Sequence, residues 1–418
     1  MELQPQQLRL RVLDTVRLSP PPAPAQHAAL PLSGLDADRN ALDVTFRTLR
    51  FFPPPPPSID PHAVLPPAFE AALGLFPVLA GRLRDGHVVV GAGAVPIVLA
   101  ESGLSAADVD TDCPGSPQLD RLAPPGDGDA EDAADTPVLA LQATRFACGG
   151  VALGVRVAHA LCDGAGATKF LTAAARFALG QGTPEVAPVW ERRELLGPRR
   201  PPRVATQVFD RVLALDGDVA RRGPYGAEGE WPEQQRQLTR ECFHVSDARV
   251  EALRARIADE AGVKLTTSEV VAAFIWRARV KANGTSSGEV VKMVYSMNIS
   301  KLVDPPPPDG YWGNVCVPEL HRHDGVTAGA VSAFTDWRRL GHGEVDFGWG
   351  GPDSVLPLSW RILGSTEPCF LLPYGAGDER RRGGFKVFIA LQRTGLAGFR
   401  EEMQELLLQP QLSSAGKL

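Results

Sequence analysis

The sequence lacks several features that would assign it to a common class of protein. Its six cysteines include no CxxC pair, so the sequence indicates neither a disulfide framework nor a cysteine-based zinc site. No apolar run approaches the length of a membrane span, and the opening segment MELQPQQLRLRV has no apolar signal-peptide core. Scattered cysteines and the absence of a targeting segment are typical of a reduced compartment. We therefore expect a cytosolic protein.

Nucleotide-binding motifs and an excess of positive charge are also missing. Neither GxGxxG nor GxxxxGK[ST] occurs, so nothing favours a dinucleotide or a nucleoside triphosphate. The chain has 43 Lys and Arg against 49 Asp and Glu, which gives a net charge of −6. That balance argues against a nucleic-acid or anionic-membrane surface. We expect neither as a partner.

The length and the distribution of proline predict two domains. A chain of 418 residues exceeds what one hydrophobic core usually supports. Near its midpoint, residues 182–207 are rich in proline and charge and show no sustained apolar period, which indicates an interdomain crossover. We predict a first domain over 1–181, a linker over 182–207 and a second domain over 208–418.

Strand-like and helix-like periodicities are mixed in both halves. Strands are predicted over 42–52, 150–159, 289–299 and 384–392, and helices over 63–76, 166–179, 266–282 and 396–408. In 150–159, the residues Val151, Leu153, Val155 and Val157 share one face, which predicts a strand buried on one side only. The mixture predicts an α/β or α+β fold.

The segment HALCDG, residues 159–164, is the first candidate for chemistry. About half an HxxxD match is expected by chance at average composition, and HGEVD at 342–346 is a second match. His159 lies between a predicted strand and a predicted helix, and its imidazole can accept a proton near neutral pH. A structural histidine that closes the strand is an equal alternative, whereas a metal site lacks further ligands nearby. His342 lacks such a boundary, so we expect an incidental surface histidine.

Taken together, HALCDG (159–164) and DFGWGGP (346–352) resemble the HxxxDG and DFGWG signatures of the plant BAHD acyltransferases. Further blocks resemble the family and occur in family order: LPLSGLD (30–36), FPVLAGRLR (76–84), PVWERRELL (188–196), SEVVAAFIWRARV (268–280), DPPPPDGYWGN (304–314) and FTDWRRLG (334–341). The resemblance covers nearly the whole chain. It implies two chloramphenicol-acetyltransferase-like domains, each a mixed sheet flanked by helices, with a solvent channel between them.

The resemblance also implies a reaction and roles for individual residues. An acyl-CoA is the co-substrate, with no permanently bound cofactor and no metal. His159 is the general base that deprotonates the acceptor, Asp163 pairs with an arginine in a structural role, and Trp337 donates its indole N–H to the oxyanion. A buried aromatic anchor is the alternative for Trp337. The residues expected to contact substrate are Thr267, Ser268, Ser296 and Thr335, and those expected to hold loops in shape are Gly164, Asp346, Phe347, Gly348, Trp349 and Gly350.

One position departs from the family pattern. The arginine that commonly pairs with the HxxxD aspartate is replaced here by Ser300, in the segment NISKLVDPPPP. Either Lys301, Arg277 or another cation takes its place, or neutral hydrogen bonds hold Asp163. The sequence leaves both possibilities open.

Three functions are open at this point. The first is transfer of an acyl group, most plausibly hydroxycinnamoyl, from CoA to the hydroxyl of a small alcohol. The alternative is an N-acyltransferase that makes amides of a polyamine such as spermidine. The third is a non-catalytic relative that binds acyl-CoA, for which Ser300 is the single argument. We expect a monomer in each case.

Overall fold

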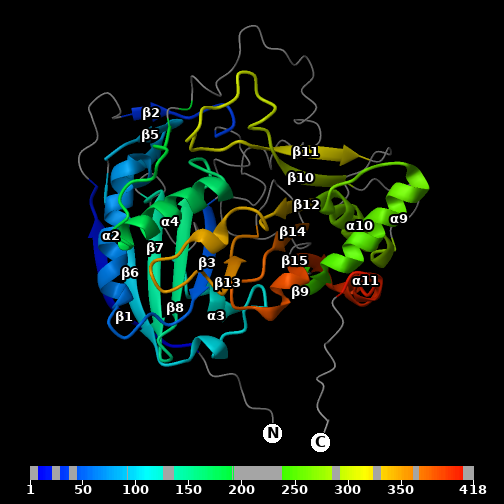
Figure 1. Cartoon of the computed structure of the whole chain (residues 1–418), viewed down its shortest axis with the longest axis horizontal. Helices are drawn as coiled ribbons and strands as arrows, with labels where there is room; N and C mark the ends of the chain where they lie inside the picture. The colour runs from blue at the N-terminus through cyan, green and yellow to red at the C-terminus, as the bar shows by residue number, and fades with distance from the viewer. Residues whose placement is uncertain are drawn as a thin grey trace, which may run out of the picture.

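The computed structural model describes residues 8–20, 29–36, 45–91, 93–125, 136–190, 192, 238–284, 292–322, 331–360 and 367–407. Within these residues, the strands form two six-stranded sheets and one three-stranded sheet (Figure 1). Both large sheets contain parallel and antiparallel pairs, such as β6 with β7 and β7 with β8 in the first. The predicted mixed α/β fold with two sheets flanked by helices is confirmed.

The first sheet contains a strand from late in the sequence. Its strands, in spatial order, are β1 (Leu10–Leu18), β6 (Val95–Ser102), β7 (Leu139–Phe146), β8 (Val151–Ala158), β3 (Thr45–Phe52) and β13 (Ser354–Pro357). β13 pairs antiparallel with β3, with Ser354 opposite Phe51. The segment 208–418, which we predicted as the second domain, therefore contributes to the first sheet. The two sheets do not divide at a single point of the chain.

The second sheet has the order β11 (Cys316–Arg322), β10 (Lys292–Asn298), β12 (Val331–Asp336), β14 (Glu367–Leu372), β15 (Gly384–Gln392) and β9 (Leu238–Ser246). The small sheet consists of β2 (Ala29–Pro31), β5 (His87–Val89) and β4 (Arg82–Arg84). β12 runs parallel to both of its neighbours, β10 and β14. It lies in the interior of the second sheet.

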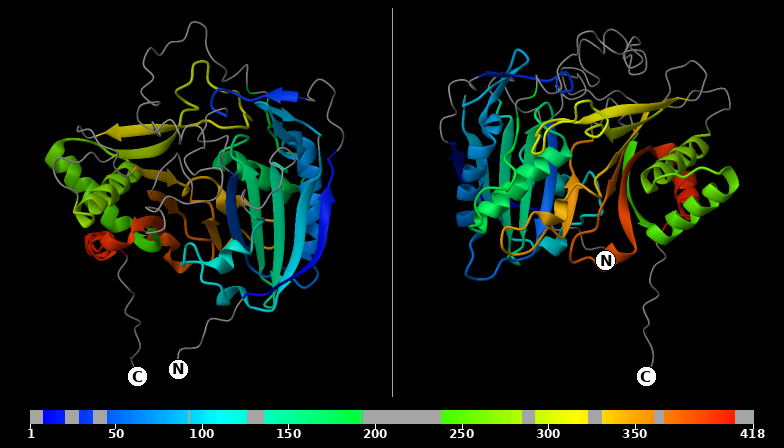
Figure 2. Two further views of the ribbon diagram at one scale, coloured as in Figure 1. Left: turned by 180° about the vertical axis from the view of Figure 1, so that it is seen from behind. Right: turned by 45° about the horizontal axis from the view of Figure 1, so that its top comes forward.

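Helices cover the outer face of each large sheet. α2 (Pro61–Leu75) and α4 (Gly164–Ala178) pack on the first, and α9 (Asp247–Ala261), α10 (Thr267–Ala282) and α11 (Leu396–Met403) pack on the second (Figure 2). The short elements are the helix α3 (Pro117–Asp120) and the 3₁₀ turns η2 (Pro77–Ala80), η3 (Ala106–Asp108), η6 (His342–Glu344), η7 (Glu379–Arg382) and η8 (Arg393–Gly395). Local caps explain where the long helices begin. Thr266 and Glu269 form a capping box at α10, and Asp60 caps α2 before a proline at its first position.

Three hydrophobic clusters make up the core. One lies between the first sheet and α2 and α4, and a second lies between the second sheet and α9, α10 and α11. The third joins the inner faces of the two sheets, with Phe51 and Leu356 from the first and Phe370 and Phe388 from the second. The molecule is thus layered as helices, sheet, sheet and helices. This third cluster brings residues of the two halves together.

The strand over 150–159 shows a different burial from the one we predicted. β8 is buried on both faces, from Val151 to Val157, whereas the alternation predicted one exposed face. β8 lies between β7 and β3, and each face of the sheet meets another layer. The small residues Ala152 and Gly154 allow this. A Cβ at position 154 would lie 2.4 Å from the Cα of Ala123.

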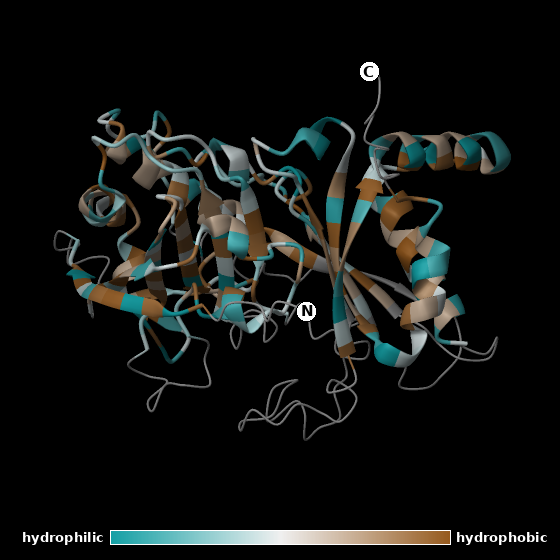
Figure 3. Ribbon diagram, turned by 90° about the horizontal axis from the view of Figure 1, so that it is seen from below, coloured by the Kyte–Doolittle hydropathy of each residue, from teal (hydrophilic) through white to brown (hydrophobic). Residues whose placement is uncertain are grey.

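The other predicted elements agree with the structure to within a few residues. The described helices are shorter or less apolar than a membrane span would require. Apolar residues gather along the strands and on the helix sides that meet them, and polar residues lie toward the outer turns (Figure 3). The part of the predicted linker beyond Arg192 lies outside the described residues.

Candidate active site

His159 lies at the point where β8 ends and the chain turns into α4. Asp163 is the N-cap of α4, and its Oδ1 accepts a hydrogen bond of 3.0 Å from the Gly166 N–H. A Cβ at position 166 would lie 2.7 Å from that of Cys162. The glycine is therefore needed for this tight turn. The turn fixes the histidine at the end of a buried strand.

One aromatic ring connects His159 with Trp337. Phe46 of β3 packs edge-on against the His159 ring at a centroid distance of 5.9 Å and against the Trp337 ring at 5.3 Å. Trp337 follows β12, and its backbone N–H donates to the Leu371 carbonyl at 2.8 Å. Among the described residues, its indole N–H has no hydrogen-bond partner. His159 and Trp337, the two residues predicted for catalysis, therefore both pack on Phe46 at the boundary of the two sheets.

The surroundings of His159 favour its neutral form. Dense packing lowers the pKa of the imidazole below its usual 6.5, and the negative charge of Asp163 opposes this only in part. Nδ1 is enclosed and has no hydrogen-bond partner in the described residues. A neutral imidazole has a free lone pair, so this histidine can serve as a base at neutral pH.

The lowered pKa gives a testable pH dependence. The active form of a general base is the deprotonated one, so kcat/KM is expected to be constant above pH 7. It should fall in acid with a midpoint below 6.5. The measurement is kcat/KM from pH 5 to 9 in buffers of constant ionic strength, with circular dichroism at each pH as the control for folding. A midpoint above 7 would contradict the assigned environment of His159.

Neutral hydrogen bonds hold Asp163, which is the second of the two possibilities that Ser300 left open. Its Oδ2 accepts from the Val315 backbone N–H and from the Cys316 thiol, both at 3.3 Å. Arg277 is half exposed and lies 3.9 Å from Glu405. In the described part of the chain, no arginine or lysine contacts Asp163. Among the described residues, Asp163 thus shows neutral partners in place of the arginine that the family pattern implies.

A buried network that we did not predict anchors the other side of the His159 turn. Asp36 is fully buried and accepts from Asn314 Nδ2 at 2.8 Å and from Ser33 Oγ at 2.7 Å. Arg192 Nη1 lies 3.4 Å from Asp36 Oδ2 and donates to the Ala160 carbonyl at 3.3 Å.

Asn314 connects this buried network with His159. Its Nδ2 also donates to the backbone carbonyl of His159 at 2.8 Å. The guanidinium of Arg192 lies over the Trp312 ring at 5.1 Å, which adds a cation–π contact. Segments around 36, 192 and 314 thereby fix two consecutive carbonyls of the HxxxD turn. The sequence signal for this buried network lies in the blocks LPLSGLD and GYWGN, since each places a polar residue among apolar ones.

His342 is a buried residue, and our expectation of a surface histidine is wrong. It is 4% exposed, and its Nδ1 lies 3.4 Å from Arg50 Nη2 and 3.2 Å from Thr168 Oγ1. Burial and the nearby Arg50 cation lower its pKa to about 3, so it stays neutral. Its ring packs on Trp337 at 5.4 Å. Two distant elements, β3 and α4, enclose a loop that looked exposed in the sequence.

Two of the residues predicted to contact substrate lie side by side on the second sheet. Tyr295 pairs with Phe334 in the parallel register of β10 and β12, and Phe334 packs on the helices behind the sheet. Alternation along the strands then turns Ser296 and Thr335 toward the first sheet. Thr335 is half-buried and two residues before Trp337. The structure thus brings Ser296 and Thr335 together near Trp337.

The other two, Thr267 and Ser268, lie in the first turn of α10. The Ser268 hydroxyl donates to Asp336 and accepts from Arg338 Nη2 at 3.2 Å. Burial alone would raise the pKa of Asp336, but the Arg338 guanidinium at 2.6 Å outweighs it and lowers the pKa. This ion pair engages the Ser268 hydroxyl in the described structure. A substrate role for Thr267 and Ser268 stays a prediction.

The DFGWG segment is a tight loop against the first sheet. Asp346 Oδ1 accepts from the backbone N–H groups of Gly348 and Gly350, each at 2.8 Å. Phe347 packs on Phe52 and stacks on Trp349, with centroid distances of 5.7 Å for both. The loop leads into β13, which completes the first sheet. Its contacts are consistent with the structural role we predicted.

Gly348 is expected to be required for the shape of this loop. Its φ is +106°, and a Cβ there would lie 3.3 Å from Leu179 Cδ2. Gly348→Ala should therefore destabilise the protein by about 1–3 kcal/mol. Chemical denaturation measures this. Gly343→Ala in the same segment is the matched control, because its φ is not positive and no atom lies within 4 Å of the added Cβ. Equal stability of the two variants would contradict the strain argument.

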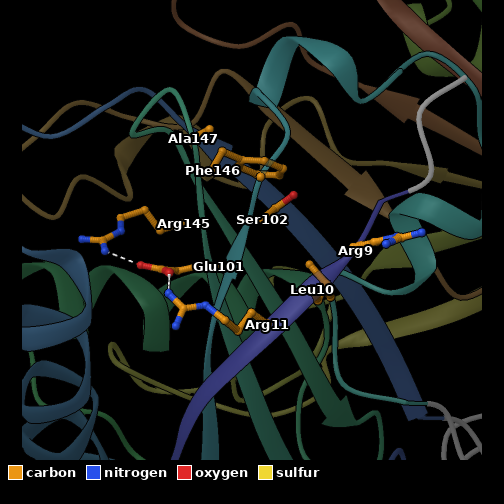
Figure 4. Close-up of a pocket in the computed structure, with 9 residues that line it drawn as sticks. Arg9, Leu10, Arg11, Glu101, Ser102, Arg145, Phe146 and Ala147 are labelled. Atoms are coloured by element: carbon orange, nitrogen blue, oxygen red, sulfur yellow. Dashed lines mark hydrogen bonds and ion pairs between the residues drawn. The ribbon is translucent and has the colours of Figure 1, made fainter.

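Two other features of the described residues carry no catalytic chemistry. A cavity of about 480 Å³ lies at the edge of the first sheet, where Glu101 bridges Arg11 and Arg145 (Figure 4). The Glu101 carboxylate in its lining is already paired with these two arginines. We assign no function to it.

The second feature is the cluster of Asp112, Cys242 and His244, whose potential metal ligands lie within 4.8 Å of one another. Lys386 Nζ is 2.6 Å from Asp112, and Arg380 Nη1 is 3.2 Å from His244 Nδ1. These two cations repel a metal ion. We assign no metal to the cluster.

Comparison with known proteins identifies relatives along the whole chain. Residues 17–325 and 321–406 match the model of the Transferase family. The 3'-N-debenzoyl-2'-deoxytaxol N-benzoyltransferase of Taxus canadensis is 29% identical, over 93% of this chain and 94% of its own length. The spermidine sinapoyl-CoA acyltransferase of Arabidopsis thaliana is 27% identical, over 64% of this chain and 67% of its own.

Solved structures share the fold. The crystal structure of vinorine synthase superposes with a TM-score of 0.72 and 19% identity, covering 96% of this chain and 99% of that one. By their names, the relatives include O-acyltransferases as well as N-acyltransferases. The comparisons therefore leave the type of acceptor open.

Proposed function

Because the chain belongs to the Transferase family, the BAHD acyltransferases, and is an acyl-CoA-dependent O- or N-acyltransferase, we propose that His159 is its general base. The observation that carries the proposal is the Phe46 ring, which packs against both His159 and Trp337. The pKa of His159 is lowered by its burial, and the Trp337 indole N–H has no hydrogen-bond partner among the described residues. In the proposal, the base acts on the acceptor and the hydrogen-bond donor acts on the thioester carbonyl oxygen.

The proposed reaction is direct attack on the thioester. Nδ1 of His159 is enclosed, so Nε2 accepts the proton of the acceptor hydroxyl or amine. The acceptor oxygen or nitrogen then forms a bond to the thioester carbonyl carbon, and the carbonyl oxygen becomes an oxyanion. When the tetrahedral intermediate collapses, the carbon–sulfur bond breaks, and the CoA thiolate takes the proton back from His159. The acceptor is the nucleophile, so no acyl-enzyme forms.

Trp337 is the proposed donor to the oxyanion. Removing one such donor typically lowers kcat by about 10²–10³-fold, and we expect this for Trp337→Phe. Trp360→Phe is the matched control, because both tryptophans pack edge-on against Phe370 at 5.4 Å. The readout is kcat at saturating acyl-CoA. If both variants lose activity equally, Trp337 is only an aromatic anchor.

For the substrates, we propose a hydroxycinnamoyl donor and the hydroxyl of a small alcohol. The names of relatives that use sinapoyl-CoA and coumaroyl-CoA support the acyl group. A caffeoyltransferase and an alcohol acyltransferase among the relatives support the hydroxyl acceptor. A polyamine acceptor is the second candidate, since two relatives are named for spermidine.

The test is release of CoA from p-coumaroyl-CoA in the presence of alcohols, polyamines or neither, with mass spectrometry of the product. An ester product supports the proposal, and an amide supports the second candidate. Absence of CoA release with every acceptor would favour the non-catalytic acyl-CoA-binding relative. The proposal includes a cytosolic monomer without a resident cofactor, which size-exclusion chromatography and a metal assay of the purified protein can check.

A further inference from the structure

A groove runs along α4. Its volume is about 610 Å³, within the usual range for small-molecule sites. Four segments form its walls, namely α4, residues 184–188, residues 309–310 and residues 339–344. Ala165 and Arg176 both line it, and 11 residues of helix span about 16 Å. The groove is therefore long enough for an extended ligand. We call it the α4 groove.

The lining of the α4 groove includes residues close in sequence to both proposed catalytic residues. Ala165 follows His159 by six residues, and Leu340 follows Trp337 by three. Thr168, also in the lining, contacts the Nδ1 of His342 at 3.2 Å, and the His342 ring packs on Trp337. Two side chains in contact, Thr168 and His342, thus connect the groove with Trp337.

The lining combines an apolar floor with an excess of positive charge. Apolar side chains come from Phe76, Ala173 and Leu340, among others. The cations are Lys169, Arg176 and Arg339, and the carboxylates are Asp309 and Glu344. Lys169 and Arg176 are seven residues apart, which places them on one side of α4. Arg339 belongs to the facing wall, so cations lie on both sides.

Arg176 has unused donor capacity. Its Nη2 donates to the Thr183 carbonyl at 3.3 Å, which orders the side chain. Its Nε is enclosed and has no hydrogen-bond partner among the described residues. A buried N–H without an acceptor is costly unless a ligand supplies one. Guanidinium groups bind carboxylates and phosphates through such paired N–H donors.

We propose that the α4 groove binds an anionic oxygen group, a phosphate or a carboxylate, carried by one of the two substrates. The inference rests on the proposed acyl transfer and names the ligand chemistry of that site. The apolar floor takes the body of the ligand, and Arg176 and Arg339 bind its anion. A polyammonium ligand would instead meet three like charges against two carboxylates, Asp309 and Glu344. The anion can come from the phosphates of CoA or from a carboxylate on the acceptor.

The binding experiment separates the anion site from catalysis. Titration calorimetry measures the Kd of CoA and of 3'-dephospho-CoA on the full chain carrying His159→Ala, with and without Arg176→Met and Arg339→Met. Methionine keeps the apolar stem of arginine. If CoA supplies the anion, each variant should raise the Kd of CoA about tenfold. Arg381→Met, at an exposed position on η7, is the matched control and should leave the Kd unchanged.

The kinetic experiment tests the other source. If the acceptor supplies the anion, the Kd of CoA should not change. The same two variants, in the chain with His159 intact, should then raise KM about tenfold for 4-hydroxyphenyllactate but not for its methyl ester. The inference is overturned if the double variant changes neither the Kd of CoA nor the KM for 4-hydroxyphenyllactate by more than twofold. It is also overturned if the only effect of the double variant is a lower KM for spermidine. If the variants weaken CoA binding but the chain with His159 intact turns over no acceptor, the anion site is supported and the proposed function is refuted.

Discussion

His159→Ala is expected to lower kcat by about 10²–10⁴-fold while the protein stays folded. The imidazole is the one group that the structure places at the end of β8 with a lowered pKa and a free lone pair. Its removal leaves the acceptor protonated when it meets the thioester. The measurement is steady-state turnover of p-coumaroyl-CoA, together with the thermal unfolding temperature and the Kd of CoA. Both of these should stay close to the wild-type values.

The control for this variant is His87→Ala. His87 is exposed on β5, and its Nδ1 contacts only the nearby Asp85 carbonyl at 2.9 Å. Its loss should leave kcat within about twofold of wild type, since it touches no part of the candidate site. Wild-type turnover by His159→Ala would show that the general-base assignment is wrong. Loss of turnover together with unfolding would instead indicate the structural role that the sequence left open.

The second large effect is expected at Asp36. Asp36→Ala leaves the Arg192 guanidinium, whose side chain is 3% exposed, without its carboxylate. Breaking a buried ion pair in this way costs about 3–5 kcal/mol. Asn314 loses its acceptor as well, so it no longer fixes the His159 carbonyl. We therefore expect lower stability and a lower kcat, measured by urea denaturation and by turnover at saturating substrates.

The double variant Asp36→Ala/Arg192→Met separates these two effects. Removing both charges relieves the uncompensated cation, so stability should recover in part. The kcat should stay low, because Asn314 still lacks its acceptor. Glu251→Ala is the control, since Glu251 and Arg254 form an exposed pair on α9, and exposed pairs contribute little. The network does not anchor His159 if two results are found together: the free energy of unfolding of Asp36→Ala lies within 1 kcal/mol of the wild-type value, and its kcat is unchanged.

This network also explains how the protein tolerates Ser300. In the family pattern, an arginine beside the HxxxD aspartate would hold the turn from the α4 side. Here Asp163 uses backbone N–H groups and a thiol, and a different arginine, Arg192, binds the turn through the Ala160 carbonyl. Contacts from separate segments thus hold the turn in the described structure. The position of His159 therefore depends on the packing of the crossover segment.

Local order was readable from the sequence, because it depends on residues a few positions apart. The capping box of Thr266 and Glu269 and the proline after Asp60 set the starts of α10 and α2. Alternation identified β3, and the chemistry of HALCDG between a strand and a helix identified His159 as a candidate. Each of these signals comes from a single stretch of chain.

Long-range partners were decided by the tertiary structure alone. Asp36, Arg192 and Asn314 are far apart in sequence, and only the packing of the sheets brings their side chains together. The same is true of His342, which Arg50 and Thr168 enclose from two other elements. A buried charge selects whichever partner the fold places within reach, and the sequence around it carries no record of that choice. The sequence by itself thus determined most of the elements and singled out His159, and the fold determined what holds His159 in place.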